Sequence, residues 1–264
     1  MKPEQHPVAA ALLDWYAEHA RDLPWRGETD PYRVWVSEVM LQQTRVATVI
    51  PYYRAFLARF GSIGELAQAD LDDVLAAWAG LGYYRRARAL HAGAQSLAPE
   101  YEMPTSVEGL LTVPGIGRYT AGAIASMAYG LDAPVVDGNV MRVFCRLHGL
   151  DGDPYAPALS RTLWGLAEEL IPKGRAADLN QAVMELGALV CSPRGPSCPA
   201  CPLAAMCVAR QTGLVEELPR RRVRGPRRQL RLALAVVVRA GQVLVRRRAL
   251  EGLFGGMWEF PSRE

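Results

Sequence analysis

Apolar residues recur three or four positions apart over most of the first 190 residues, a spacing that predicts amphipathic helices. The segments "HPVAAALLDWYAEHA" and "ADLNQAVMELGALVC" show this pattern. The segment "DLDDVLAAWAGLGYYRRARALHAGAQSLA" is expected to form two helices joined at Gly80–Gly82. We expect "DPYRVWVSEVMLQQTRVATVIPYYRAFLARF" to break at Pro51, because proline lacks the N–H that a helix interior needs. The pattern therefore predicts a mainly α fold.

The pattern changes near Leu218. The segment "LPRRRVRGPRRQLR" is rich in proline, arginine and glycine, and it predicts a basic linker at residues 211–228. Residues 229–264 include "LRLALAVVVRAGQVLVRRR", in which two β-branched runs flank an Ala-Gly-Gln turn and predict two strands. Two strands and a short tail are too little for an independent domain. This segment is therefore expected to be the beginning of a second, incomplete domain.

Composition narrows the class of protein only a little. Half of the 264 residues are apolar and 22% are charged, as in ordinary globular proteins. The N-terminus has no apolar signal-peptide core, and no apolar run is long enough to span a bilayer, which predicts a cytosolic protein without a membrane partner. The net charge of +3 says little about partners, but Lys2 and Lys173 are the only lysines.

A glycine turn stands in "LLTVPGIGRYTAGAIA". Before it, Thr105 and Glu108 have the spacing of a capping box and predict a short helix. The backbone N–H groups around Gly115 and Gly117 and at the start of the next helix can face one anion. A dinucleotide-binding turn would need a preceding strand and a glycine or alanine where Thr120 stands. The turn is therefore either a phosphate-binding hairpin or a helix–turn–helix that packs without a ligand.

Four of the five cysteines crowd into one stretch with the spacing C-x6-C-x2-C-x5-C: Cys191, Cys198, Cys201 and Cys207. In a cytosolic protein such clustering favours a metal site over disulfides. Four thiolates can hold a [4Fe–4S] cluster or one Zn²⁺, and the single C-x-x-C pair favours the cluster. Cys145 lies at helical spacing on an apolar face, so we expect it to be a packed core thiol.

Two carboxylates are candidates for acid–base chemistry. Glu38 lies in the apolar segment "YRVWVSEVMLQQT", where it is either at the solvent edge or functional. If it is buried, desolvation raises its pKa and suits it to a general acid. Asp137 stands where a helix N-cap would stand, which favours its ionised form. The two environments are expected to keep one acid neutral and the other charged, as in acid–base division of labour.

The glycine turn resembles the helix–hairpin–helix element of base-excision DNA glycosylases, in which a single aspartate follows, here in "APVVDGNVMRV". The string "CSPRGPSCPACPLAAMC" resembles the cluster loop of the endonuclease III and MutY families. "LPWRGETDPYRVWVSEVMLQQTRVATVIPYY", "WAGLGYYRRARALH", "VPGIGRYTAGAIASMAYG" and "LNQAVMELGALVC" resemble, in order, the MutY adenine DNA glycosylases. This resemblance covers residues 10–210, and "LFGGMWEFP" resembles the start of that family's Nudix-like C-terminal domain.

The resemblance implies a two-lobed, all-helical glycosylase domain at residues 1–210. A six-helix lobe with the hairpin would occupy residues 24–132, and the second lobe would combine the two ends of the domain with a [4Fe–4S] loop at residues 191–207. A truncated α/β Nudix-like domain would follow the linker. A monomer in the bacterial cytosol or nucleoid is expected.

The resemblance also implies base excision repair. The substrate would be double-stranded DNA with adenine mispaired with 8-oxoguanine or guanine, and the adenine would be flipped out of the duplex. Glu38 would protonate the adenine, Asp137 would stabilise an oxocarbenium-like sugar, and Asn139 would orient water or a carboxylate. Further residues match the adenine pocket (Trp25, Arg26, Gln181), the wedge in the duplex (Gln43, Tyr83) and the phosphate-binding hairpin (Gly115, Gly117).

Other interpretations stay open for several of these residues. Tyr83 and Tyr84 are alternatively packing residues, and Gln43 lies alternatively on a solvated helix face. The basic side chains of Arg85, Arg86 and Arg88 either meet phosphates or lie on a solvated face.

Tyr119 bears on the type of glycosylase. In the endonuclease III family a lysine that forms a Schiff base stands at this position, and neither Lys2 nor Lys173 is placed to replace it. This predicts a monofunctional glycosylase in which Tyr119 lies against the catalytic site and water completes the reaction. The alternatives are a bifunctional glycosylase and AP lyase, a non-catalytic iron–sulfur DNA-binding protein and a structural zinc protein.

Overall fold

The computed structural model describes residues 6–220, 229, 231–249 and 254–263. Residues 221–228 of the predicted linker therefore lie outside the described residues. The chain divides into two units, residues 1–221 and 222–264. Within the described ranges, no helix combines the length and apolar character needed to cross a membrane.

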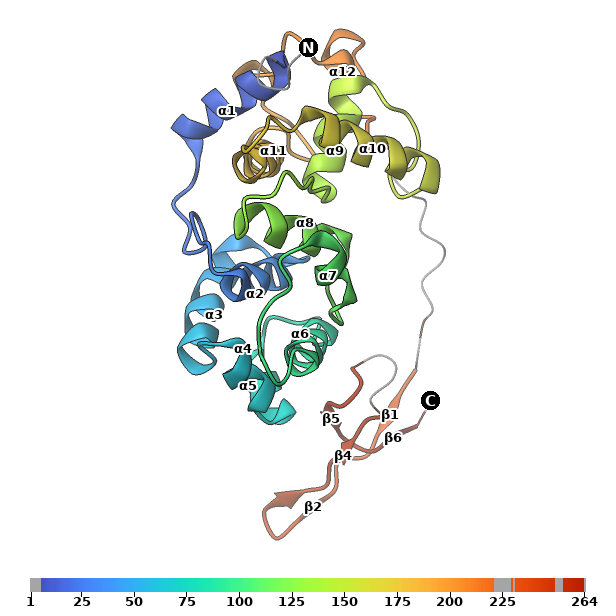
Figure 1. Ribbon diagram of the computed structural model, residues 1–264. Coiled ribbons are helices and arrows are strands. Elements are labelled where there is room, and N and C mark those ends of the chain that lie inside the picture. The colour runs from blue at the N-terminus through green and yellow to red at the C-terminus, as the bar shows by residue number, and fades with distance from the viewer. Residues whose placement is uncertain (1–5, 221–228, 230, 250–253, 264) are drawn as a thin grey trace. The chain divides into compact units, whose positions relative to one another are not determined.

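The first unit is helical, as the sequence predicted (Figure 1). Its helices are α1 (Pro7–His19), α2 (Pro31–Leu41), α3 (Val46–Arg59), α4 (Ile63–Gln68), α5 (Leu71–Ala77), α6 (Arg85–Ser96), α7 (Val107–Thr112), α8 (Arg118–Met127), α9 (Gly138–His148), α10 (Pro157–Leu170), α11 (Ala176–Leu189), the 3₁₀ turn η2 (Cys198–Ala200) and α12 (Val208–Gln211). The predicted junction at Gly80–Gly82 between α5 and α6 is confirmed, because both glycines adopt positive φ.

The predicted break at Pro51 is wrong. Pro51 lies inside α3, and the chain instead leaves the helical conformation between α2 and α3, at residues 42–45. Pro51 and Ala47 are both exposed. The carbonyl that loses its N–H partner therefore lies on the solvent side of α3, where a proline costs less than in a buried helix.

The helix before the glycine turn begins one residue later than the predicted capping box. Ser106, not Thr105, is the N-cap of α7, and its Oγ accepts the N–H of Gly109 at 3.1 Å. Both threonine and serine hydroxyls can cap a helix. Ser106 is the N-cap here, and its backbone has the extended conformation that is typical of this position.

Two hydrophobic cores hold the first unit together. The first, around Trp35, Phe56 and Trp78, draws its buried residues from positions 23–133. The second, around Phe144 and Leu163, combines α1 with residues 136–203. Helix α8 packs against both α2 and α11, between the two groups of helices (Figure 1). Its glycine, alanines and serine are buried, and such small side chains allow close approach on both sides.

One side chain fixes the segment that connects the two cores. Asn180 on α11 accepts the N–H of Val135 at 3.2 Å, and its amide donates to Ser126 Oγ at 3.1 Å and to the carbonyl of Ala133 at 2.9 Å. All of these groups are buried, so the amide satisfies backbone atoms that would otherwise be left unpaired. The bonds place the segment that leads to Asp137.

The second unit consists of short antiparallel pairs: β1 (Ala233–Leu234) with β6 (Ser262–Arg263), β2 (Val238–Arg239) with β3 (Gln242–Val243), and β4 (Arg246–Arg247) with β5 (Trp258–Glu259). The predicted turn lies between β2 and β3, where Ala240 and Gly241 have φ of 49° and 74°, as a two-residue hairpin requires. Each of the two predicted strands forms two short strands with different partners: β1 and β2 before the turn, and β3 and β4 after it. The Nudix-like character of this unit stays a prediction.

Replacing Gly122 in α8 is expected to destabilise the first unit. Alanine normally favours a helix over glycine, but a Cβ here would collide with the backbone oxygen of Pro134. We expect Gly122→Ala to lower the free energy of unfolding by about 1–3 kcal/mol in urea denaturation. Gly165 in α10 has open space at its Cβ position, so the control Gly165→Ala should gain up to about 1 kcal/mol. Equal stability of the two variants would contradict this packing.

Candidate active site

A cleft of about 730 Å³ opens between residues of the two cores. This volume is in the range of small-molecule sites. Ten of the predicted site residues line it: Trp25, Arg26, Glu38, Gln43, Gly115, Gly117, Tyr119, Asp137, Asn139 and Gln181. Tyr83 does not line this cleft. It lines a neighbouring cavity of about 450 Å³, together with Gln43 and Gly115.

Glu38 is buried on α2, with only 4% of its surface exposed, so the solvent-edge interpretation is wrong. Its Oε2 accepts a hydrogen bond from the hydroxyl of Tyr119. Burial raises the pKa of Glu38 to about 7, against the opposing effect of this hydrogen bond. Burial also raises the pKa of Tyr119 well above its ordinary value, so the phenol stays a donor.

Asp137 is the N-cap of α9, as predicted. Its Oδ1 accepts the N–H groups of Asn139 at 2.9 Å and Val140 at 2.8 Å, and its Oδ2 accepts the amide of Asn139 at 2.8 Å. The expected opposite shifts of the two acids are wrong, because burial raises the pKa of Asp137 as well, and the hydrogen bonds only reduce this rise. A helix N-terminus therefore does not outweigh desolvation here. Asn139 orients the carboxylate, one of its two predicted roles.

A second buried glutamate in the cleft was missed. Glu185 on α11 is 2% exposed and binds Arg21 through two side-chain contacts of 2.6 and 2.8 Å, and Arg26 at 2.6 Å. Burial would raise its pKa, but the two guanidinium groups outweigh this and lower it. Arg26 also donates to Gln181 Oε1. The signal that singled out Glu38, a carboxylate in an apolar helix, is present in "AVMELGAL" as well.

The glycine turn has the geometry of an anion site. Gly115 has a φ of 85°, and a Cβ there would lie 2.8 Å from Cβ of Ala89, so no other residue fits without a shift. Gly117 is the N-cap of α8 and supplies no side-chain cap. The first N–H groups of α8 therefore keep their donors for another partner, at the positive end of the helix dipole.

The residues for which the sequence left two interpretations open differ in their exposure to solvent. Tyr83 is 58% exposed, so packing does not explain it, whereas Tyr84 is half-buried with its hydroxyl near the N–H of Gly80. Arg86 is turned inward and donates to backbone carbonyls, including those of Val39 and Met40. Neither of the roles considered for Arg86 from the sequence is therefore correct.

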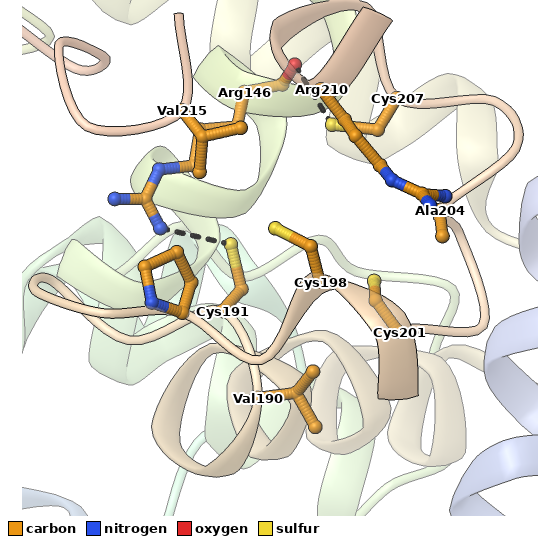
Figure 2. A pocket seen from close by; sticks show the side chains of 10 residues that line it. Arg146, Val190, Cys191, Cys198, Cys201, Ala204, Cys207, Arg210 and Val215 are labelled. Carbon is orange, nitrogen blue, oxygen red and sulfur yellow. Dashed lines mark hydrogen bonds between the residues drawn. The ribbon is translucent and has the colours of Figure 1, made fainter. Parts of the chain in front are cut away.

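The four clustered cysteines line one cavity, which Figure 2 shows with Arg146 and Arg210 beside them. Arg146, which is 2% exposed, donates to Cys191 Sγ at 3.3 Å, and Cys207 Sγ lies 3.4 Å from the carbonyl of Arg146. Among the described residues, no three His, Cys, Asp or Glu side chains are arranged to hold a single metal ion. Cys145 lies in the second core, as predicted, and burial raises its pKa to about 11.

One arginine connects the cysteine loop with the cleft. Arg142 Nε donates to the carbonyl of Cys191 at 2.7 Å, and its Nη2 donates to Gly187 O at 2.7 Å and to Asn139 Oδ1 at 2.8 Å. Because Asn139 in turn binds Asp137, the position of the carboxylate depends on a continuous chain of hydrogen bonds that ends at the cysteine loop.

A glycine hairpin that opens a helix, beside a cleft with buried carboxylates, defines the helix–hairpin–helix class of base excision DNA repair proteins. The family model "HhH-GPD superfamily base excision DNA repair protein" matches residues 36–169. A solved structure of a thermostable thymine-DNA glycosylase is similar, with a TM-score of 0.71 and 28% identity, over 78% of this chain and 95% of that one.

Within this class, the chain belongs to the adenine DNA glycosylase family, known also as the MutY family. It is 41% identical to the adenine DNA glycosylase of Homo sapiens over 96% of this chain, which is 56% of the human protein. The adenine DNA glycosylase of Mycolicibacterium smegmatis is 43% identical, over 91% of this chain and 83% of that protein. The chain therefore spans little more than half the length of the human relative.

The raised pKa of Glu38 makes stability depend on pH. The folded pKa of about 7 exceeds the ordinary value of 4.5, so the native state holds this proton more tightly than the unfolded state does. The contribution of Glu38 to stability is therefore greatest below pH 4.5, and this contribution, about 3 kcal/mol, is lost as the pH rises to about 7. We expect Glu38→Gln to remove this slope in urea denaturation between pH 5 and 8. A variant that keeps the wild-type slope would show that another group titrates.

Proposed function

We propose that the protein is an adenine DNA glycosylase of base excision repair, which removes adenine mispaired with 8-oxoguanine or guanine from double-stranded DNA. The observation that carries this proposal is the burial of Glu38, which raises its pKa to about 7, in the same cleft as Asp137. Breaking an N-glycosidic bond requires a proton on the departing base and negative charge beside an oxocarbenium-like sugar. The relatives named adenine DNA glycosylase supply the substrate of the proposal.

Glu38 acts as the general acid in this mechanism. With a pKa of about 7, it carries its proton near neutral pH and gives it to a ring nitrogen of the flipped adenine as the C1′–N9 bond breaks. Tyr119 holds Oε2 of Glu38, which leaves Oε1 as the oxygen that faces the base. The remaining carboxylate then accepts a proton from the water that attacks C1′.

Asp137 stabilises the sugar cation. Both of its oxygens are fixed by hydrogen bonds from Asn139 and Val140, so the carboxylate does not have to reorganise when positive charge develops at C1′. The products of the complete sequence are free adenine and an abasic site, and no enzyme group stays covalently bound.

Trp25, Arg26 and Gln181 form the adenine pocket. Trp25 is held edge-on against Tyr53, with ring centroids 5.4 Å apart. Arg26 donates through its terminal nitrogens to Glu185 and Gln181, while its buried Nε has no hydrogen-bond partner among the described residues.

The duplex is held at the hairpin and opened by two side chains. The N–H groups behind Gly115 and Gly117 bind a backbone phosphate without reading the sequence. Gln43 and Tyr83 enter the duplex around the opposing base, since they line one cavity next to the cleft. The extrusion costs roughly a few kcal/mol, which contacts to the flipped base and the phosphates offset.

The proposed enzyme is monofunctional. No lysine is among the residues that line the cleft in the described part of the chain, and Tyr119, at the position of the Schiff-base lysine, is a neutral phenol. Water is then the nucleophile. That the protein is a monomer and acts in the bacterial cytosol or nucleoid stays a prediction.

We also propose that Cys191, Cys198, Cys201 and Cys207 hold a [4Fe–4S] cluster. The donor set fits, because four thiols from one loop face one cavity beside a buried arginine that favours thiolates. When bound, the cluster supplies a rigid, covalently held centre for this loop.

The proposal is tested by base release from duplexes with adenine opposite 8-oxoguanine, guanine or thymine. We expect release of adenine opposite 8-oxoguanine and guanine, and little opposite thymine. Glu38→Gln should lower the single-turnover rate about 100-fold or more and leave DNA binding unchanged, because a neutral amide cannot give a proton. A wild-type protein that binds these duplexes but releases no adenine would favour the non-catalytic DNA-binding protein.

Borohydride trapping separates the proposed enzyme from a glycosylase with lyase activity. A monofunctional enzyme forms no Schiff base, so no covalent adduct is expected with the adenine substrate or with an abasic duplex. An adduct as abundant as that of a true lyase would overturn the monofunctional assignment while leaving the base specificity in place.

The nature of the metal is tested by colour and metal content. We expect the purified protein to be brown, with iron and acid-labile sulfide in equal amounts, and Cys198→Ser to lose both. The control Cys145→Ser should keep them, since Cys145 lies in the second core. A colourless protein that contains zinc would contradict the cluster, because Zn²⁺ has no d-electron transitions.

A further inference from the structure

Arg86 reaches from α6 to the end of α2, the helix that carries Glu38. Its Nη1 lies 2.9 Å from the carbonyl of Val39 and 2.8 Å from that of Met40. These are among the last carbonyls of α2, which have no partner inside the helix. The last turn of α2 contains no basic residue, so a guanidinium from another helix supplies both the hydrogen bonds and the positive charge there.

The same guanidinium holds the two loops that carry the wedge residues. Nη1 lies 2.5 Å from the carbonyl of Gln42 and Nη2 lies 3.0 Å from Thr44 Oγ1, on either side of Gln43. Nη2 also lies 3.2 Å from the carbonyl of Gly82, directly before Tyr83.

Two aromatic side chains lie beside the guanidinium of Arg86: Trp78 at the end of α5, and Tyr83 in the loop that follows. The Arg86 Cζ lies 5.3 Å from the ring centroid of Tyr83 and 5.5 Å from that of Trp78. Arg86 therefore holds Tyr83 in two ways: it binds the carbonyl of the preceding residue, Gly82, and it lies against the ring of Tyr83.

Both wedge residues have a strained backbone. Gln43 and Tyr83 have φ of 58° and 50°, and neither is a glycine. Such conformations are disfavoured by a factor of about 5 to 150 each and persist only where the surroundings determine them. Arg86 is the side chain that contacts the main chain next to both.

We propose that Arg86 is a positioning residue for base extrusion, which fixes Gln43 and Tyr83 as one rigid wedge at a set distance from the end of α2. This inference rests on the proposed function. Through Arg86, the two side chains that open the duplex keep a fixed position relative to each other and to α2, which carries the general acid. Arg86 itself touches neither the base nor the sugar.

Lysine does not replace arginine in this role. A single ammonium carries three donors on one nitrogen, whereas the planar guanidinium spreads its donors over carbonyls of α2 and of both loops. Arg86→Lys therefore keeps the charge and loses the geometry. Arg54→Ala is the control for loss of a charge, since Arg54 is exposed on α3 and lines neither the cleft nor the cavity of Gln43 and Tyr83.

The experiment measures extrusion separately from chemistry. The probe is a duplex with 2-aminopurine next to the target adenine opposite 8-oxoguanine, whose fluorescence rises when the bases unstack, at saturating protein. We expect Arg86→Lys to lower the fluorescence change and the single-turnover rate about tenfold. Arg54→Ala should leave the fluorescence change as in the wild type, and Glu38→Gln should keep it while losing base release.

Thermal unfolding and a milder variant guard against a misfolded protein. If Arg86→Lys unfolds at a lower temperature, Thr44→Val removes only one acceptor beside Gln43 and should show a smaller loss of extrusion at an unchanged melting temperature. The inference is overturned if both variants extrude as the wild type does, or if Arg86→Lys loses base release with full extrusion. A wild-type protein without base release or extrusion would instead overturn the proposed function.

Discussion

The burial of the Glu38 carboxyl, whose hydrogen-bond partner is a phenol rather than a cation, is the constraint on which the site depends. An ionised carboxylate in this position would be costly, and the protein avoids that cost by raising its pKa to about 7. The partner that Glu38 receives is a phenol, which donates a hydrogen bond without bringing a charge. The small residues of α8 and the hydrogen bonds of Asn180 bring the two cores together beside this group.

The comparison with Glu185 shows how much the surroundings decide. Both glutamates are nearly inaccessible, both stand in apolar helices and both line the same cleft. Glu185 lies against Arg21 and Arg26 and its pKa is lowered, whereas Glu38 has Tyr119 and its pKa is raised. Glu185 is thereby a fixed anion that holds Arg26 in the wall of the cleft, whereas Glu38 has the environment that the proposed proton donor needs. Residue type and burial alone do not distinguish the two roles.

The sequence predicted the helices, the hairpin and the cysteine loop because apolar spacing, glycine turns and clustered cysteines are local signals, whereas most residues of the cleft followed from the resemblance to the MutY family. It failed where the outcome depends on distant groups. Pro51 is tolerated because it lies on the side of α3 that faces solvent. The pKa of Asp137 is raised by burial, which the local capping pattern in the sequence does not reveal. Arg86 was interpreted as a surface charge, since its carbonyl partners at Val39, Met40 and Gln42 lie more than 40 residues away in the chain.

The arginine-rich, lysine-poor composition has a structural use that net charge does not show. Arg86, Arg142 and Arg146 each bind backbone carbonyls of two or more segments: the wedge loops, the chain from Asn139 to Cys191, and the cysteine loop. A guanidinium can do this because its donors diverge in one plane and it stays charged when partly buried. An ammonium would satisfy one of these segments and release the others. The shape of the arginine side chain, at these three partly or fully buried positions, therefore contributes to the rigidity of the site.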